Sequence, residues 1–99
     1  MNISNLENAK MADQNESLQT ISDLPVRKRA LVRVLRGGKD FISRMGTLGF
    51  TPGTVVTVIQ NYGIGPVLVT VKDVRVALGR GEALKVLVEA LPNEQKGHD

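Results

Sequence analysis

The fold is decided by the stretch RMGTLGFTPGT, residues 44–54. Its first half ends a helix, because apolar residues at positions 41, 42, 45 and 48 have helical spacing and Gly49 stands where a C′ glycine ends a helix. Its second half turns the chain, because Pro52 fixes φ and Gly53 accepts a positive φ, as a type II turn requires. We therefore expect a helix over 40–48, with Asp40 as its N-cap or in its first turn, and a strand after the turn.

The sequence on both sides of this stretch alternates in the manner of β-strands. Five short segments rich in β-branched residues are bounded by Gly, Pro and Asn, at 30–36, 54–60, 66–72, 74–78 and 84–90. The pair Lys72-Asp73 predicts a tight hairpin, and residues 79–82 predict a bend or short helical turn. The pattern predicts a mainly β fold, a small barrel of five strands with one short helix inserted after the first strand. Met45, Leu48 and Phe50 are expected to face its core.

A chain of 99 residues has room for one domain. Residues 1–19 and 92–99 are polar, so we expect a disordered or loosely helical N-terminal tail, a domain over 20–91 and a disordered C-terminal tail. The N-terminus lacks the pattern of a signal peptide, and no apolar run reaches the roughly 18 to 20 residues that span a bilayer. The expected location is therefore the cytoplasm.

Side chains that carry chemistry are scarce. The sequence has no cysteine and one histidine, His98, which excludes thiol nucleophiles, thiolate zinc fingers and a catalytic triad within the domain. Its carboxylates form no recognisable pair, and Gly37-Gly38-Lys39 lacks the spacing of a phosphate-binding loop. We therefore expect no enzyme, no catalytic residue, no cofactor and no metal site.

Charge is spread unevenly along the chain. Residues 20–91 hold eleven basic and five acidic side chains, a net charge of +6, whereas residues 1–19 carry −2 and residues 92–99 carry −1. A basic domain favours acidic partners, namely nucleic acid, an anionic membrane surface or an acidic protein face, although net charge also serves solubility. A basic barrel that binds nucleic acid is therefore one alternative. Barrels that bind single strands usually stack bases on aromatic side chains, and this chain offers only Phe41, Phe50 and Tyr62.

The stretch at 44–54 resembles the ferrous iron transport protein A (FeoA) family. The resemblance extends to TISDL at 20–24, GPV at 65–67, VAL at 76–78, EA at 82–83 and VLV at 86–88, and so covers about residues 20–91. It implies an SH3-like barrel with a helix inserted after the first strand. It also implies a small cytoplasmic accessory of the inner-membrane ferrous iron transporter FeoB, with no catalytic residues. Transition metal ion binding is described for the family, whereas residues 20–91 offer only scattered carboxylates as ligands.

The resemblance implies a protein–protein interaction module that docks on the cytosolic part of a FeoB-type transporter and assists or regulates it. We expect this module to be a monomer or a weak dimer. The candidate contacts lie in the basic run and between the helix and the barrel: Arg27, Lys28, Arg29, Arg44, Met45, Thr47, Phe50, Pro52 and Gly53. The cationic members can steer an acidic partner, so replacing the basic run 27–29 by serine should weaken binding with little change in melting temperature. Leu48→Ala should cost about 2 to 5 kcal/mol if this side chain is buried.

Overall fold

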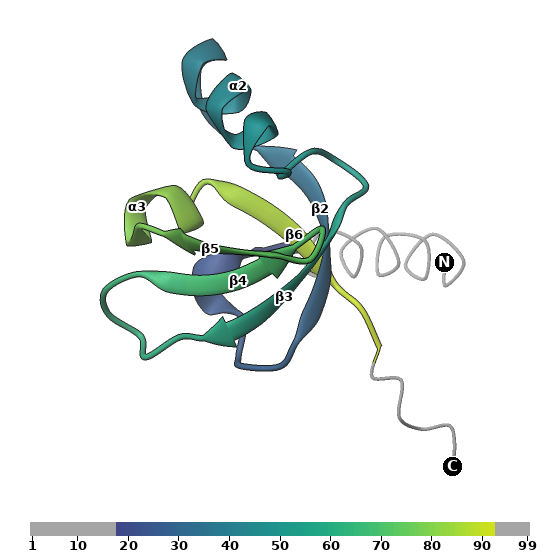
Figure 1. The fold of residues 1–99 in the computed structure, drawn as a ribbon, viewed down its shortest axis with the longest axis vertical. Helices are drawn as coiled ribbons and strands as arrows, with labels where there is room; N and C mark the ends of the chain where they lie inside the picture. The colour runs from purple at the N-terminus through teal and green to yellow at the C-terminus, as the bar shows by residue number, and fades with distance from the viewer. Residues whose placement is uncertain (1–17, 93–99) are drawn as a thin grey trace, which may run out of the picture.

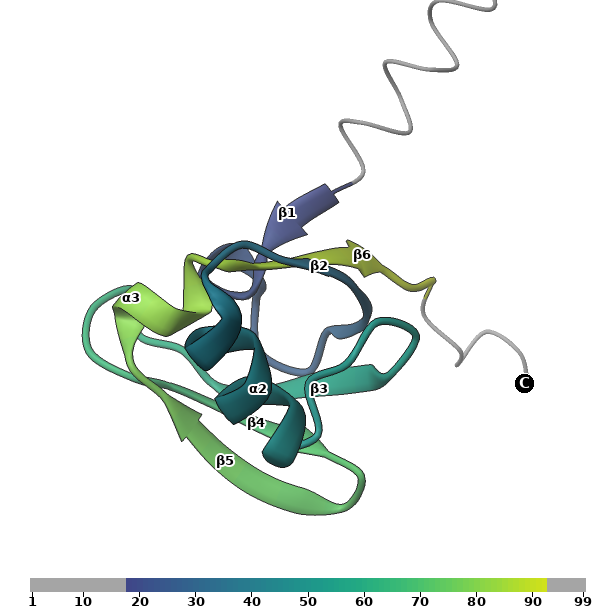
Figure 2. The same cartoon turned by 90° about the horizontal axis from the view of Figure 1, so that it is seen from above.

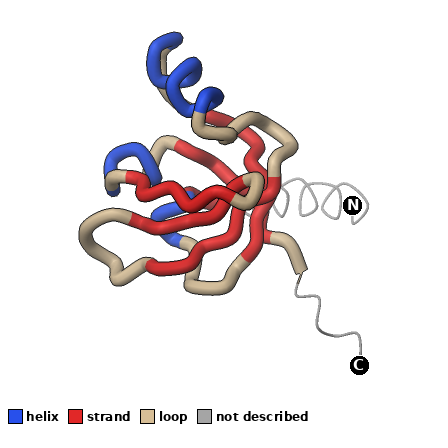
Figure 3. Tube along the Cα trace, viewed as in Figure 1, coloured by secondary structure: helices blue, strands red, loops and turns tan. Residues whose placement is uncertain are grey.

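The computed structural model describes residues 18–92 (Figure 1). Six strands form one antiparallel sheet in the order β1-β6-β2-β3-β4-β5, and helices are few (Figure 3). The elements are β1 (Leu18–Thr20), the 3₁₀ helix η1 (Ile21–Asp23), β2 (Arg29–Leu35), α2 (Lys39–Thr47), β3 (Val55–Gln60), β4 (Val67–Val71), β5 (Val74–Leu78), α3 (Arg80–Ala83) and β6 (Val86–Ala90).

The prediction of a mainly β fold is confirmed, with one strand more than expected. The extra strand is β1, which pairs with β6 and begins two residues before the expected domain start. Three residues are too few to show an alternation, so only the pairing with β6 reveals this strand. Because β1 comes first, the inserted helix α2 follows the second strand rather than the first. The tails expected over 1–19 and 92–99 lie, apart from residues 18, 19 and 92, outside the described residues.

Two register shifts bend the sheet. In β2 the shift falls between Val32 and Val34, and in β3 it falls between Val58 and Gln60. An extra residue in one strand increases the local twist and reverses which face the following side chains occupy. Val32 is therefore buried, whereas Val34 pairs with the outward-facing Leu87 and is 41% exposed.

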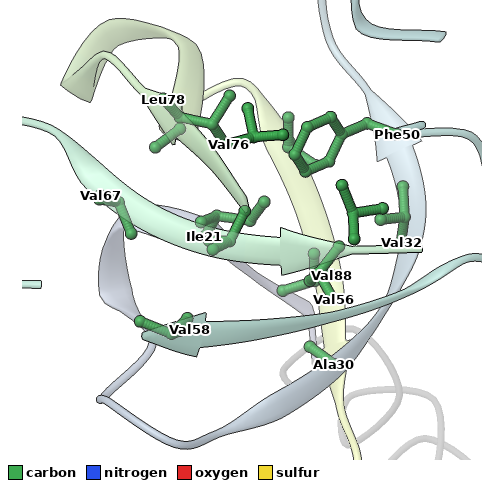
Figure 4. Packing of buried hydrophobic residues seen from close by; sticks show 14 of the residues in the cluster. Ile21, Ala30, Val32, Phe50, Val56, Val58, Val67, Val76, Leu78 and Val88 are labelled. Carbon is green, nitrogen blue, oxygen red and sulfur yellow. The ribbon is translucent and has the colours of Figure 1, made fainter. Parts of the chain in front are cut away.

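The interior is aliphatic. Figure 4 shows Val32, Val56 and Val88 from three different strands near one another, with Phe50 above them and Val67 farther along the same cluster. Among the described residues, no polar or charged side chain is buried. Each fully buried valine, leucine or phenylalanine contributes about 1.5 to 3 kcal/mol relative to an exposed one, so this cluster is the main source of stability.

Two turns have the geometry that their residues predict. Thr54 donates its N–H to the Thr51 carbonyl at 3.1 Å and Gly53 has a φ of 95°, which confirms the type II turn. Lys72 and Asp73 have φ values of 53° and 66° between the paired strands β4 and β5. Two positive φ values in a two-residue loop are those of a type I′ hairpin.

Helix α2 lies at one end of the barrel, and the view from above shows it across that end (Figure 2). Its buried side chains are Phe41 and Met45, whereas Leu48 is 40% exposed. The expectation that Leu48 faces the core is therefore wrong. Leu48 is the C-cap of α2, and beyond it the chain curls back until the Phe50 N–H donates to the Met45 carbonyl at 2.9 Å. Phe50, with no exposed surface, takes the core position instead.

Candidate docking surface

The predicted contact residues lie at two separate ends of the barrel. Residues 27–29 lead into β2, and Arg44 and Thr47 belong to the helix that follows it. Strand β2 has seven residues, which corresponds to about 20 Å at 3.3 Å per residue. Figure 1 shows the turn before β2 and helix α2 at opposite ends of the sheet. The nine residues therefore do not form one surface, and each end must be assessed by itself.

Residues 25–28, called the basic turn from here on, form a β-turn that is fixed to strand β3. The Lys28 N–H donates to the Pro25 carbonyl at 3.2 Å and closes the turn. The Arg27 N–H donates to the Val58 carbonyl at 2.7 Å, and the Val58 N–H donates to the Lys28 carbonyl at 3.0 Å. These bonds fix the turn backbone, while the Arg27 side chain is exposed and Lys28 is half-buried. The turn thus presents cationic side chains from a defined backbone.

An open groove of about 560 Å³ lies beside the basic turn. Its walls are apolar and cationic, and they come from Val26, Arg27, Arg29, Thr57, Val58 and Ile59. The two arginines were predicted from the sequence as contacts, whereas Val26 and Ile59 were not. Val26 could have been noticed in the sequence, because it is an apolar residue directly before a basic run, in a turn where a polar residue is expected. In the structure its side chain is 46% exposed. Ile59 lies at the register shift of β3, which no sequence pattern indicated.

At the other end of the barrel, Arg44 joins two helices. Its Nη2 lies 2.9 Å from Oε2 of Glu82, and its guanidinium lies 5.6 Å from the ring centre of Phe41. The second oxygen of Glu82, Oε1, accepts the Gly79 N–H at 3.1 Å at the start of α3. Lys85 Nζ lies 5.2 Å from the same ring of Phe41. Arg44 therefore links α2 to α3, and a partner that used it would compete with Glu82.

The other predicted contacts at this end differ in exposure. Met45 and Phe50 have no exposed surface, which confirms that they face the core and leaves their side chains inaccessible to a partner in this structure. The Thr47 hydroxyl is exposed and donates to the Ser43 carbonyl at 3.1 Å. Pro52 and Gly53 are exposed, and the Gly53 N–H donates to the Val32 carbonyl at 2.8 Å.

A polar network that the sequence analysis missed lies around Arg80. This side chain donates to the carbonyls of Gly65 and Ser22 at 3.0 and 3.2 Å and to Oδ1 of Asn61 at 3.1 Å. Asn61 in turn donates to the carbonyls of Ser22 and Leu24 at 3.0 and 2.9 Å. The network ties η1, the loop before β4 and α3 together, so its role is to hold loops rather than to contact a partner.

Potential metal ligands do not gather in the part of the chain that the structure describes. Over residues 18–92, no group of three or more His, Cys, Asp or Glu side chains lies close enough to hold a metal ion. In the same residues, none of the helices has the length and apolar character needed to cross a membrane.

The family model described as FeoA domain matches residues 19–90 of this chain. The chain belongs to the FeoA family. The FeoA match begins within β1 and ends at the last residue of β6, so it spans the whole sheet. It also confirms the resemblance that the sequence carries in residues 20–91.

Individual FeoA proteins agree with this assignment. "Putative Fe(2+) transport protein A" of Methanocaldococcus jannaschii is 32% identical over 62 residues, which cover 63% of this chain and 74% of that protein. The crystal structure of an iron uptake regulatory protein (FeoA) has a TM-score of 0.72 at 28% identity and covers 75% of this chain and 99% of its own. FeoA of Stenotrophomonas maltophilia, solved with zinc and described as an SH3 domain protein, has a TM-score of 0.64 at 33% identity. It covers 72% of this chain and 89% of its own, and the FeoA fold seen here is SH3-like.

Proposed function

We propose that this chain is a cytoplasmic accessory protein of ferrous iron uptake that docks on the cytosolic part of a FeoB-type membrane transporter. In this role it is a protein–protein interaction module that assists or regulates the transporter. The observation that carries the proposal is the FeoA-domain match over residues 19–90, which covers almost all of the described chain.

The charge distribution supports an acidic partner. Residues 20–91 have a net charge of +6, and two of their five carboxylates are already engaged in ion pairs, Glu82 with Arg44 and Glu89 with Arg33. Surplus cations on a small domain attract an acidic protein face and accelerate its association. The basic turn carries part of this excess positive charge on the exposed Arg27 and the half-buried Lys28. We therefore assign the initial contact with the transporter to this turn.

Nucleic-acid binding is less well supported. Phe41 is 8% exposed and Phe50 is fully buried, so among the described residues only Tyr62, at 77% exposure, could stack on a base. Barrels that bind single strands generally combine several aromatic platforms with a basic groove. The same positive charge is better matched by an acidic protein surface.

An NMR titration tests the proposal. The full ¹⁵N-labelled chain is titrated with the cytosolic part of a FeoB-type transporter from the same organism, with and without guanine nucleotide. We expect amide shifts at the basic turn, and weaker binding by a variant that carries Arg27→Ser and Lys28→Ser. A matched control carries Arg36→Ser and Lys39→Ser, which remove the same charge from exposed positions at the far end of β2. Absence of binding under both nucleotide conditions would contradict the proposal. Tight binding of a single-stranded oligonucleotide with a steep salt dependence would favour the alternative.

A further inference from the structure

We propose that the groove beside the basic turn binds an extended segment of a partner protein that carries acidic and apolar side chains on the same face. The inference rests on the proposed function for the origin of that segment. It names the chemistry of the site, which neither the family match nor the named relatives specify.

The first observation is backbone strain in the basic turn. Arg27 occupies the third position of the turn with a φ of 77°, in the left-handed region that glycine adopts freely and other residues avoid. A positive φ at this position is characteristic of a type II turn, in which glycine is strongly preferred. Strained residues persist where the surrounding structure holds them, and they gather at binding sites. Here the strained residue is an arginine, so the turn keeps a guanidinium at a position where glycine would be more stable.

The second observation is where that guanidinium lies. Arg27 and Arg29 both line the groove of about 560 Å³, and Val26 and Ile59 add apolar wall. A volume of this order is typical of a ligand-binding cleft and holds a few side chains. Val26 is 46% exposed, so a partner can still cover apolar surface there. The Arg27 guanidinium therefore offers charge-assisted hydrogen bonds to a carboxylate, and Val26 and Ile59 offer an apolar contact in the same groove.

The third observation concerns the backbone next to the groove. The N–H and C=O of Val58 are both bonded to the basic turn, so a partner cannot use these two groups to extend the sheet. At Val58, recognition therefore comes from the neighbouring side chains. The Thr57 hydroxyl has no side-chain partner among residues 18–92 and is half-buried in the groove wall, where it can donate to a carboxylate or a peptide carbonyl.

These observations favour a peptide over other anions. No aromatic side chain lines the groove, so it offers no platform on which a nucleic acid base could stack. A recess with apolar walls also fits the side chains of an extended chain better than it fits the flat headgroup surface of a bilayer. In an extended segment every second residue lies on the same face, so acidic and apolar residues that take turns at every second position present both kinds of side chain to the groove.

The test uses two synthetic peptides of equal length, one with glutamate and isoleucine in turn at every second position and serine between them, and the other with glutamine in place of each glutamate. The full ¹⁵N-labelled chain is titrated with each. We expect the glutamate peptide to shift the amides of Val26, Arg27 and Ile59 and to bind about tenfold more tightly than the glutamine peptide. Equal binding of both peptides, or shifts confined to the α2 end of the barrel, would overturn the inference.

Arg27→Gly separates binding from folding. Glycine relieves the positive φ, so we expect the melting temperature to rise by a few degrees while affinity for the glutamate peptide falls about tenfold. Arg27→Lys keeps the charge and the strain but loses the planar donor pair, and we expect intermediate affinity. Unchanged peptide affinity in Arg27→Gly would refute the assignment of this guanidinium. Because this variant is expected to fold better than the parent, a loss of binding cannot be attributed to unfolding.

Further titrations distinguish this inference from the proposed function. If the glutamate peptide binds in the groove and the transporter's cytosolic part does not, the groove chemistry stands and the transporter assignment fails. If the transporter part binds and shifts only α2, the transporter assignment stands and the groove inference fails. Phosphatidylglycerol vesicles or a single-stranded oligonucleotide that displaced the peptide from the groove at equal concentration would also overturn the peptide as the occupant.

Discussion

Replacing Arg80 by methionine should lower the stability of this small barrel measurably, although the residue is only half-buried. The side chain donates three hydrogen bonds, of which those to Ser22 and Asn61 are partly buried and that to Gly65 is exposed. A typical bond of this kind contributes about 0.5 to 1.5 kcal/mol, and we expect a total of about 2 kcal/mol after discounting the exposed one. Methionine keeps most of the aliphatic stem, so little of this loss comes from packing.

The loss is bounded because no buried acceptor is left without a donor. The Ser22 carbonyl still accepts from Asn61 Nδ2 at 3.0 Å, and Asn61 Oδ1 still accepts the Gly63 N–H at 3.0 Å. The Gly65 carbonyl belongs to an exposed residue and can turn to water. A much larger penalty would require an orphaned buried group, which this arrangement avoids.

Urea unfolding followed by far-UV circular dichroism gives the measurement. We expect the midpoint to fall at an unchanged m-value, and the melting temperature to fall by about 8 to 16 °C, because about 1 kcal/mol shifts a domain of this size by 4 to 8 °C. The matched control is Arg75→Met, since Arg75 is exposed on β5 and has no side-chain partner among the described residues. A loss for Arg80→Met no larger than that of the control would refute the reasoning.

Four further substitutions test the packing and the turns, each by urea unfolding. Met45→Ala should cost about 2 to 5 kcal/mol because the side chain is fully buried, whereas Leu48→Ala, at 40% exposure, should cost less than about 1 kcal/mol; equal losses would contradict the packing of α2. Asp73→Gly should raise the free energy of unfolding by about 0.5 kcal/mol, because glycine is preferred as the second of the two loop residues in a type I′ hairpin. A decrease would speak against that turn type. Gly49→Ala should cost about 2 kcal/mol, because φ is +106° and an added Cβ would lie 3.2 Å from Val71; a neutral result would mean that this C-cap relaxes freely.

The sequence predicted the elements and turns well because their signals are local. Alternation of β-branched residues identified β2 to β6, and Pro52-Gly53 and Lys72-Asp73 predicted the turns that the structure contains. The helix was predicted to within one residue at each end, because Gly49 marks where it stops. Each of these features depends on residues within a few positions of one another.

Features that depend on distant residues escaped the sequence analysis. Leu48 fits the apolar stripe of α2, but its burial depends on where Phe50 returns to the core. The register shifts in β2 and β3 move Val34 and Ile59 away from simple alternation without any local marker. The network around Arg80 joins three segments far apart in the chain, so no spacing rule could identify it.

The candidate contacts were predicted in part. Charge identified the basic run, but the groove beside it is completed by Thr57 and Ile59 from another strand. Arg44 was predicted to share a surface with the basic run, but the seven residues of β2 separate the two at opposite ends of the barrel. Charge can be summed along a sequence, whereas the shape of a surface depends on which strands become neighbours.

The position of β6 within the sheet has a consequence for synthesis on the ribosome. β6, the last strand of the described residues, lies between β1 and β2, which are the first two. The meander from β2 to β5 connects neighbours in sequence and can pair while the nascent chain is still growing. β1 has no partner until residues 86–90 have left the exit tunnel, so this sheet becomes complete only after β6 has been synthesised. Until then the strand edges of β1 and β2 that pair with β6 have no hydrogen-bonding partner. We therefore expect nascent chains stalled before residue 86 to be sensitive to protease.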